Sequence, residues 1–263
     1  MVVFPQLSSG AGMQFPSVRR RTVRAAMNEL RDGSAISYAD PAYAAISWEL
    51  AFRDLTDDEA AGVSSLFEAV EGRRGTFTFV DPTANLLAFS EDLSQSCWSK
   101  SPLVRTDVGV NDPLGGTRAI RLTNTAMIAQ VVSQQLAAPA SFVYAFSVYA
   151  RAQYLTTVAL SRAAGGNTHK RTFDLGSGWT RCVLAGAFNS SAESVVFGFE
   201  VPEAGAIEVF GFQVEAQPCA SAYKKTGARN GVYSSARFGE DTLRVVTDGP
   251  DQHRFQIRIT AKD

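Results

Sequence analysis

Apolar and polar residues alternate along much of this chain, which is the period-two pattern of strands that bury one face. In residues 43–52 this pattern places Ile46, Trp48 and Leu50 on the same face. We therefore expect Trp48 to lie in a core. The pattern recurs at residues 76–80, where it predicts another strand.

A hairpin is predicted before residue 43. Residues 22–30 and 34–38 flank Asp32-Gly33, and Asp-Gly favours a tight turn because glycine accepts a positive φ. Prolines in the first 21 residues predict an extended arm there. Three consecutive arginines in this arm are either solvated or an oligomer contact: Arg19, Arg20 and Arg21.

One helix is predicted next. Thr56 and Glu59 have the spacing of a capping box, and the acids of the first turn suit the positive end of the helix dipole. Gly72 is a candidate C-terminal stop. The apolar residues recur at helical spacing and form one stripe: Ala60, Val63, Leu66, Phe67 and Val70.

The middle of the chain is predicted to be almost entirely strands, separated by turns rich in glycine and proline. The expected strands are residues 119–124, 141–152, 156–162, 168–175, 180–189, 194–202 and 206–216. Many short strands with regular turns indicate a sandwich of the jelly-roll kind. Beyond it, residues 242–247 and 253–260 predict two closing strands.

The segments before and after this sandwich read as one interrupted domain. We expect a mainly β fold, in which an outer β-sandwich or α+β domain with one helix is interrupted by a jelly-roll β-sandwich. The outer domain is assigned to residues 1–84 plus 229–263, and the inserted domain to residues 85–228.

Composition is that of a globular protein, with 45% hydrophobic and 19% charged residues. The net charge of −1 gives no reason to expect nucleic acid or a membrane as partner, and no stretch approaches the roughly 20 apolar residues of a membrane span. The three cysteines lack CxxC spacing, so we expect buried free thiols, as in a protein made in a reducing cytosol: Cys97, Cys182 and Cys219.

No pattern indicates catalysis, and we expect no enzymatic activity. His169 and His253 lie in strand patterns without acidic or cysteine neighbours in sequence. Nucleophile-elbow, zinc-protease, phosphate-loop and dinucleotide-binding motifs are absent from the sequence. The adjacent carboxylates Glu91 and Asp92 would face opposite ways on a strand, which does not suit an acid and base pair.

Carboxylates in two loops form a candidate metal site. Glu91 and Asp92, placed near the turn that begins with Asp112, would offer the oxygen ligands that a hard cation such as calcium prefers. The alternative is a polar loop without an ion. No other cofactor is expected.

Aromatic residues of the middle segment are candidates for sugar stacking, since a flat ring complements the C–H face of a pyranose. Trp98 is the first candidate platform, with Arg181 or Tyr154 supplying polar contacts. Trp179, after a Gly-Ser-Gly turn, is a second candidate. For both tryptophans the alternative is packing in the core or at the rim of the sandwich.

Several short motifs of the middle segment resemble those of the jelly-roll carbohydrate-binding modules found in phage tail and structural proteins. They are Asn85-Leu86-Leu87, Phe89-Ser90-Glu91-Asp92-Leu93, Trp98, Gly178-Trp179-Thr180-Arg181, Gly211-Phe212-Gln213-Val214-Glu215-Ala216 and Ser221-Ala222-Tyr223. The resemblance covers more than half the chain and implies a non-catalytic binding module.

The outer segments resemble the N-terminal domain of tailed-phage distal tail proteins. The motifs are Trp48-Glu49-Leu50, Gly75-Thr76-Phe77-Thr78-Phe79 with Asp81-Pro82, and Arg237-Phe238. In that family the domain forms a ring around the tail axis, and a loop can carry an inserted module. The resemblance implies a homo-oligomer, as a hexameric ring, that contacts the tail tube and tail hub proteins. It also implies a place at the virion tail tip after assembly in the host cytoplasm.

The leading hypothesis is therefore a structural component of a phage tail tip or baseplate. Its ring would join the tail tube to the tip, and its inserted module would bind host-surface glycans. Two alternatives are a stand-alone glycan-binding or glycan-degrading accessory protein, and a tail protein whose insertion is purely structural.

Overall fold

Strands dominate the computed structural model, which describes residues 1–262 and the side chains of all of these except residues 41–43. The mainly β fold class is confirmed, and the described residues contain a single helix. The chain divides into two units. The outer unit comprises Met1–Ser8, Gly12–Phe79 and Tyr233–Asp263, and the inner unit comprises Ser9–Ala11 and Val80–Val232.

The outer unit is built on one sheet. Its elements are β1 (Ser17–Glu29), β2 (Ala35–Leu55), α1 (Asp57–Ala69), β3 (Phe77–Val80), β14 (Val232–Phe238), β15 (Val245–Gly249) and β16 (Gln252–Lys262). The strand order is β1-β2-β16-β14-β3, with β15 on β16. The expected core position of Trp48 is confirmed, because its side chain is 1% exposed and lies 4.7 Å from the ring of Phe79.

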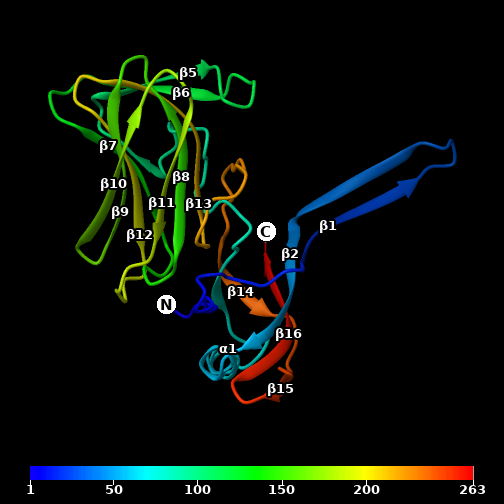
Figure 1. Cartoon of the computed structure of the whole chain (residues 1–263). Coiled ribbons are helices and arrows are strands. Elements are labelled where there is room, and N and C mark those ends of the chain that lie inside the picture. The colour runs from blue at the N-terminus through cyan, green and yellow to red at the C-terminus, as the bar shows by residue number, and fades with distance from the viewer. Residues whose placement is uncertain (263) are drawn as a thin grey trace. The chain divides into compact units, whose positions relative to one another are not determined.

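The predicted hairpin is confirmed as β1 and β2, which pair antiparallel from Ser17 opposite Leu50 to Glu29 opposite Ala35. Gly33 in the turn has a φ of 83°, a value that costs other residues energy. The hairpin extends well beyond the rest of the outer sheet as a two-stranded arm, drawn in blue in Figure 1. The end of the segment predicted as an extended arm, residues 17–21, already belongs to β1 and pairs with β2.

Helix α1 begins at the predicted capping box. The Glu59 backbone N–H donates to Thr56 Oγ1 at 3.2 Å, and the Thr56 N–H donates to Glu59 Oε2 at 3.1 Å. Four members of the predicted stripe are buried: Ala60, Val63, Leu66 and Val70. Phe67 is only partly buried and packs on Phe238 with ring centroids 5.0 Å apart.

The inner unit is a sandwich of two five-stranded sheets. Its strands are β4 (Trp98–Ser99), β5 (Val104–Val110), β6 (Ala119–Asn124), β7 (Gln130–Leu136), β8 (Tyr144–Arg151), β9 (Thr156–Ala164), β10 (Asn167–Leu175), β11 (Thr180–Gly186), β12 (Val195–Val201) and β13 (Ala206–Glu215). The sheet orders are β10-β9-β12-β7-β4 and β11-β8-β13-β6-β5. Because the chain crosses repeatedly from one sheet to the other, the sandwich has the predicted jelly-roll character.

All seven strands predicted for the middle segment are present, with ends shifted by a few residues. Three further strands of this segment were not predicted: β4, β5 and β7. The inward faces of the two sheets form one apolar core. No helix among the described residues is long and apolar enough to span a membrane.

Asn85 fixes the entrance to the inner unit. Its side chain is 1% exposed, and its amide nitrogen donates to Phe212 O at 2.9 Å and to Lys224 O at 3.0 Å. Its Oδ1 accepts the N–H groups of Leu87 and Val214, each at 3.1 Å. A buried amide needs hydrogen-bond partners, and Asn85 finds them on both the first and the last segments of the unit. This one side chain therefore joins the two segments.

Entry and exit segments are adjacent, so the outer unit is expected to fold without the sandwich. The Asp81 N–H donates to Gly231 O at 2.8 Å, and the Gly231 N–H donates to Asn85 O at 3.2 Å. A variant that lacks residues 86–227 and carries a short polar turn at the junction should therefore keep a cooperative thermal transition, since closing a short loop costs little entropy. Circular dichroism melts would measure this, and a gradual, non-cooperative loss of signal would contradict it.

Candidate functional site

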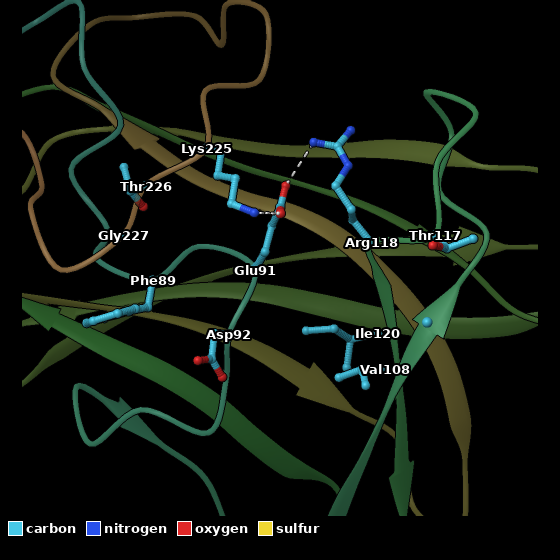
Figure 2. A pocket seen from close by; sticks show the side chains of 11 residues that line it. Phe89, Glu91, Asp92, Val108, Thr117, Arg118, Ile120, Lys225, Thr226 and Gly227 are labelled. Carbon is cyan, nitrogen blue, oxygen red and sulfur yellow. Dashed lines mark hydrogen bonds and ion pairs between the residues drawn. The ribbon is translucent and has the colours of Figure 1, made fainter.

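A depression of about 300 Å³ lies at one edge of the sandwich, where β5 and β6 meet the loops before β4 and after β13. Phe89, Val108 and Ile120 form its apolar lining (Figure 2). Charged and hydroxyl side chains complete it: Glu91, Asp92, Thr117, Arg118, Lys225 and Thr226. An apolar surface edged by a few polar groups is the usual composition of a small-molecule site.

Phe89 adopts a left-handed backbone conformation with a φ of 48°. This is unusual for a bulky residue and is held here by backbone hydrogen bonds. The Phe89 N–H donates to Gly227 O at 2.8 Å, and its carbonyl accepts from the Asp92 N–H and from Trp98 Nε1, both at 3.0 Å. These bonds fix a partly exposed ring on the lining of the depression.

Glu91 holds the two cations of the depression. Its carboxylate lies 2.7 Å from Lys225 Nζ and 3.3 Å from Arg118 Nη1, and Figure 2 shows both groups converging on it. The Glu91 side chain is only 7% exposed, whereas those of Lys225 and Arg118 are 61% and 41% exposed. The cations are therefore positioned by a buried carboxylate while their outer N–H groups remain accessible.

The carboxylates of Asp112 and Asp92 accept hydrogen bonds mainly from their own loops. Asp112 accepts from the backbone N–H groups of Leu114 and Gly116 and from Arg118 Nε. Burial alone would raise the pKa of Asp112, but these hydrogen bonds hold it below its ordinary value. Hydrogen bonds from Ser94 likewise lower the pKa of Asp92.

The predicted calcium ligands Glu91, Asp92 and Asp112 are not grouped around one point, and each carboxylate has protein partners. Glu91 and Asp112 both contact Arg118, and Asp92 is occupied by Ser94 and Gln95. Among the residues that the structure describes, no group of three or more acidic, histidine or cysteine side chains is placed to hold an ion. Protein cations and N–H donors take the oxygens that calcium would need.

Trp98 is not a sugar-stacking platform. Its side chain is 6% exposed and belongs to the core of the sandwich, 5.1 Å from the ring of Phe212. The indole N–H is used as a donor to Phe89 O. The prediction is wrong because β4 turns the ring inward, where it supports the Phe89 loop from below the surface.

The other predicted sugar contacts lie elsewhere. Tyr154 is 75% exposed in the loop after β8. Trp179 is partly exposed, and the Arg151 guanidinium lies 4.7 Å from its ring centroid. Arg181 lies over the ring of Tyr149 and donates to Ser147 Oγ at 3.2 Å. None of these residues lines the depression in Figure 2.

The three predicted interface arginines lie exposed on β1. Arg19 lies 5.9 Å from the Trp48 ring centroid and donates to the hydroxyl of Tyr233 at 3.2 Å. Arg20 forms an ion pair with Glu49 at 2.5 Å. Arg21 is exposed, and the oligomer contact of all three stays a prediction.

Sequence reasoning missed Phe89, Arg118 and Lys225 as a group. Phe89 was part of a recognised motif, but its ring was not singled out. Arg118 and Lys225 lie far from Glu91 in sequence, so only the folded sandwich brings these charges together. The clearest available signal was the position of Lys225 in a polar segment just after the last strand of the sandwich.

The inner unit is thus a jelly-roll β-sandwich with a depression at one edge. Solved structures similar to it include carbohydrate-binding modules and a phage tailspike domain. The xylan-binding domain of Paenibacillus barcinonensis Xyn10C is 14% identical, covering 53% of this chain and 96% of its own, with a TM-score of 0.42.

A second carbohydrate-binding module, solved with β-1,4-galactotriose, is 17% identical over 49% of this chain and 97% of its own, with a TM-score of 0.40. The enzymatically active domain of tailspike protein 4 from bacteriophage CBA120 is 16% identical over 52% of this chain and 22% of its own, with a TM-score of 0.38. No protein-family model matches the chain, and no curated protein matches its sequence.

Proposed function

We propose that this protein is a non-enzymatic tail-tip component whose inner unit binds host-surface glycans at the depression lined by Phe89. The observation that carries the glycan-binding role is the fixed, partly exposed ring of Phe89 beside an ion-paired group of donors and acceptors. The ring and Val108, which is 80% exposed, suit the C–H face of a sugar. Lys225, Arg118 and Thr117 suit its hydroxyl groups.

Affinity at one such site should be low. The depression is shallow and open, and one ring with a few hydrogen bonds gives on the order of millimolar binding, about −4 kcal/mol. Several copies in one assembly would raise the apparent affinity through multivalency, provided that the surface presents several glycans within reach. A weak site on an oligomer is therefore consistent with attachment to a cell surface.

Replacing Phe89 with asparagine tests the site. Asparagine tolerates a positive φ, so Phe89→Asn should remove the ring without straining the backbone, and the variant should keep a cooperative thermal transition. Binding to glycans first identified on an array with the full chain should fall by at least tenfold in a calorimetric titration, because the stacking surface is gone.

Tyr154→Asn is the matched control, since it removes another exposed ring of the same unit. If Tyr154→Asn binds the glycan normally and Phe89→Asn does not, the depression is supported as the glycan-binding site. Loss only in Tyr154→Asn would place the site at the loop after β8. An array without any bound glycan would favour a purely structural insertion.

The outer unit supports the ring role through its hairpin. β1 is exposed along almost its whole length, and apolar side chains project from both strands, including Val23 at 71% and Met27 at 70% exposure. A two-stranded ribbon is marginally stable in water by itself. We infer that a neighbouring copy covers the hairpin, as in a closed oligomer that joins tail tube and tail hub.

A further inference from the structure

A second charged cluster lies on the outward face of the sheet that contains β6, β8 and β13. Glu208 of β13 pairs with Arg121 of β6 and with Arg151 of β8 across the sheet. Its Oε1 lies 2.6 Å from Arg121 Nη2, and its Oε2 lies 2.6 Å from Arg151 Nε. One carboxylate therefore holds two guanidinium groups side by side.

These three side chains line a depression of about 490 Å³ together with Gln153 and Ser177. None of its lining residues belongs to the depression around Phe89. Arg121 and Ile120 are neighbours on β6 and project to opposite faces of the strand. The two depressions are thus separate surfaces of one sandwich.

The second depression carries an excess of positive charge. Two arginines face one carboxylate, and within the described residues no other protein acceptor binds their remaining N–H groups. Asp107, which lies opposite Arg121 on β5, forms no ion pair with it in the described structure. Burial tends to raise the pKa of Glu208, but hydrogen bonds from both arginines lower it, so the carboxylate stays ionised and holds them in place.

The guanidinium of Arg151 also packs on an aromatic ring. It lies 4.7 Å from the ring centroid of Trp179, whose indole is partly exposed beside the Gly176–Gly178 turn. Such stacking restrains an arginine while leaving its edge free to donate. Two fixed, partly unused guanidinium edges at one depression match the oxygens of a carboxylate or similar anion.

We propose that this depression is a second saccharide-binding site, selective for sugars that carry an anionic group such as the carboxylate of a uronic acid. The Arg121 and Arg151 edges bind the anion, and Gln153 and Ser177 supply partners for neighbouring hydroxyl groups. This site goes beyond the glycan-binding role proposed for the Phe89 depression, because it stands on different residues and predicts a different ligand class.

Calorimetric titration of the full chain at fixed ionic strength tests the proposal with three probes: a trimer of galacturonic acid, neutral galactotriose and inorganic phosphate. The acidic trimer should bind more tightly than either of the others. Equal binding of the neutral trimer would overturn the selectivity for anions. Equal binding of phosphate would show an anion site that does not recognise sugar.

Two variants should each weaken binding. Arg121→Gln should weaken binding of the acidic trimer roughly tenfold by removing one charge-assisted donor. Arg151→Gln should weaken it to a similar extent, because it removes the second guanidinium edge. A merely structural ion-pair ladder would leave the affinity unchanged in both variants, and that result would overturn the assigned role of the arginines.

Lys170→Gln is the matched control. It removes one cation from an ion pair with Glu200 on the other sheet, and so changes the net charge equally. Binding of the acidic trimer should be the same as in the original chain. The Phe89→Asn variant should also retain it, so failure of one site is distinguishable from failure of the other.

Discussion

Replacing Trp98 with alanine is expected to lower the free energy of unfolding of the sandwich by about 3–5 kcal/mol, as for a large aromatic residue lost from a core. The indole is 6% exposed and packs against Phe212. Its N–H bond to Phe89 O is lost as well, which leaves a carbonyl of the site loop with one donor fewer. Chemical denaturation of the full chain, followed by near-ultraviolet circular dichroism, would measure the change.

Glycan binding should weaken in the same variant, because Trp98 supports the loop that carries Phe89. Trp179→Ala provides the comparison: this ring is partly exposed, so its loss should cost clearly less stability than the loss of Trp98. If Trp98→Ala changed stability by less than about 1 kcal/mol, the indole would not be the core residue described above.

The strands that the sequence analysis missed show why patterning is incomplete. On β7, Val132, Gln134 and Leu136 face the core. The polar glutamine interrupts the apolar alternation that would otherwise predict a strand. Gln134 is buried because its amide satisfies the backbone of Ala88 in both directions, at 2.7 and 2.9 Å. A polar residue that serves a distant backbone cannot be recognised as a core residue from local sequence.

β5 was missed for a different reason. Val108, opposite Ile120 on β6, is 80% exposed at the edge of the sheet, where it lines the depression. Gly109 interrupts the apolar pattern with a φ of 84°. Edge strands near a binding surface bury too little to show clear alternation, whereas the long, well-capped α1 and the central strands do.

The candidate site was predictable only in part. Motif resemblance pointed to the segment from Phe89 to Leu93, and Phe89, Glu91 and Asp92 of this segment line the depression. The conformation of Phe89 depends on a hydrogen bond to Gly227, and the role of Glu91 depends on cations from distant segments. Local sequence does not contain these contacts. Trp98 was misassigned because a tryptophan suits a core as well as a sugar.

Removing the tip of the hairpin is expected to abolish ring assembly. Val23 and Ala44 are opposite each other on β1 and β2, so an Asn-Gly turn can join them in place of residues 24–43. The variant keeps the part of β2 that contains Trp48 and pairs with β16. It should therefore melt at nearly the same temperature as the full chain while losing the exposed surface that we propose a second copy covers.

Light scattering after size-exclusion chromatography, with negative-stain imaging, would distinguish the states. The full chain should elute at a multiple of its 28.3 kDa mass and form rings, and the hairpin variant should elute as a monomer. Leu155→Glu is the control, because it adds a charge at an apolar residue that is 85% exposed on the inner unit. Rings of unchanged size in the hairpin variant would show that the hairpin does not form the interface. A full chain that stays monomeric at all concentrations would overturn the proposal of a ring. The loss should be complete, since a closed ring repeats one interface around the whole circle and each copy has to make the contact twice.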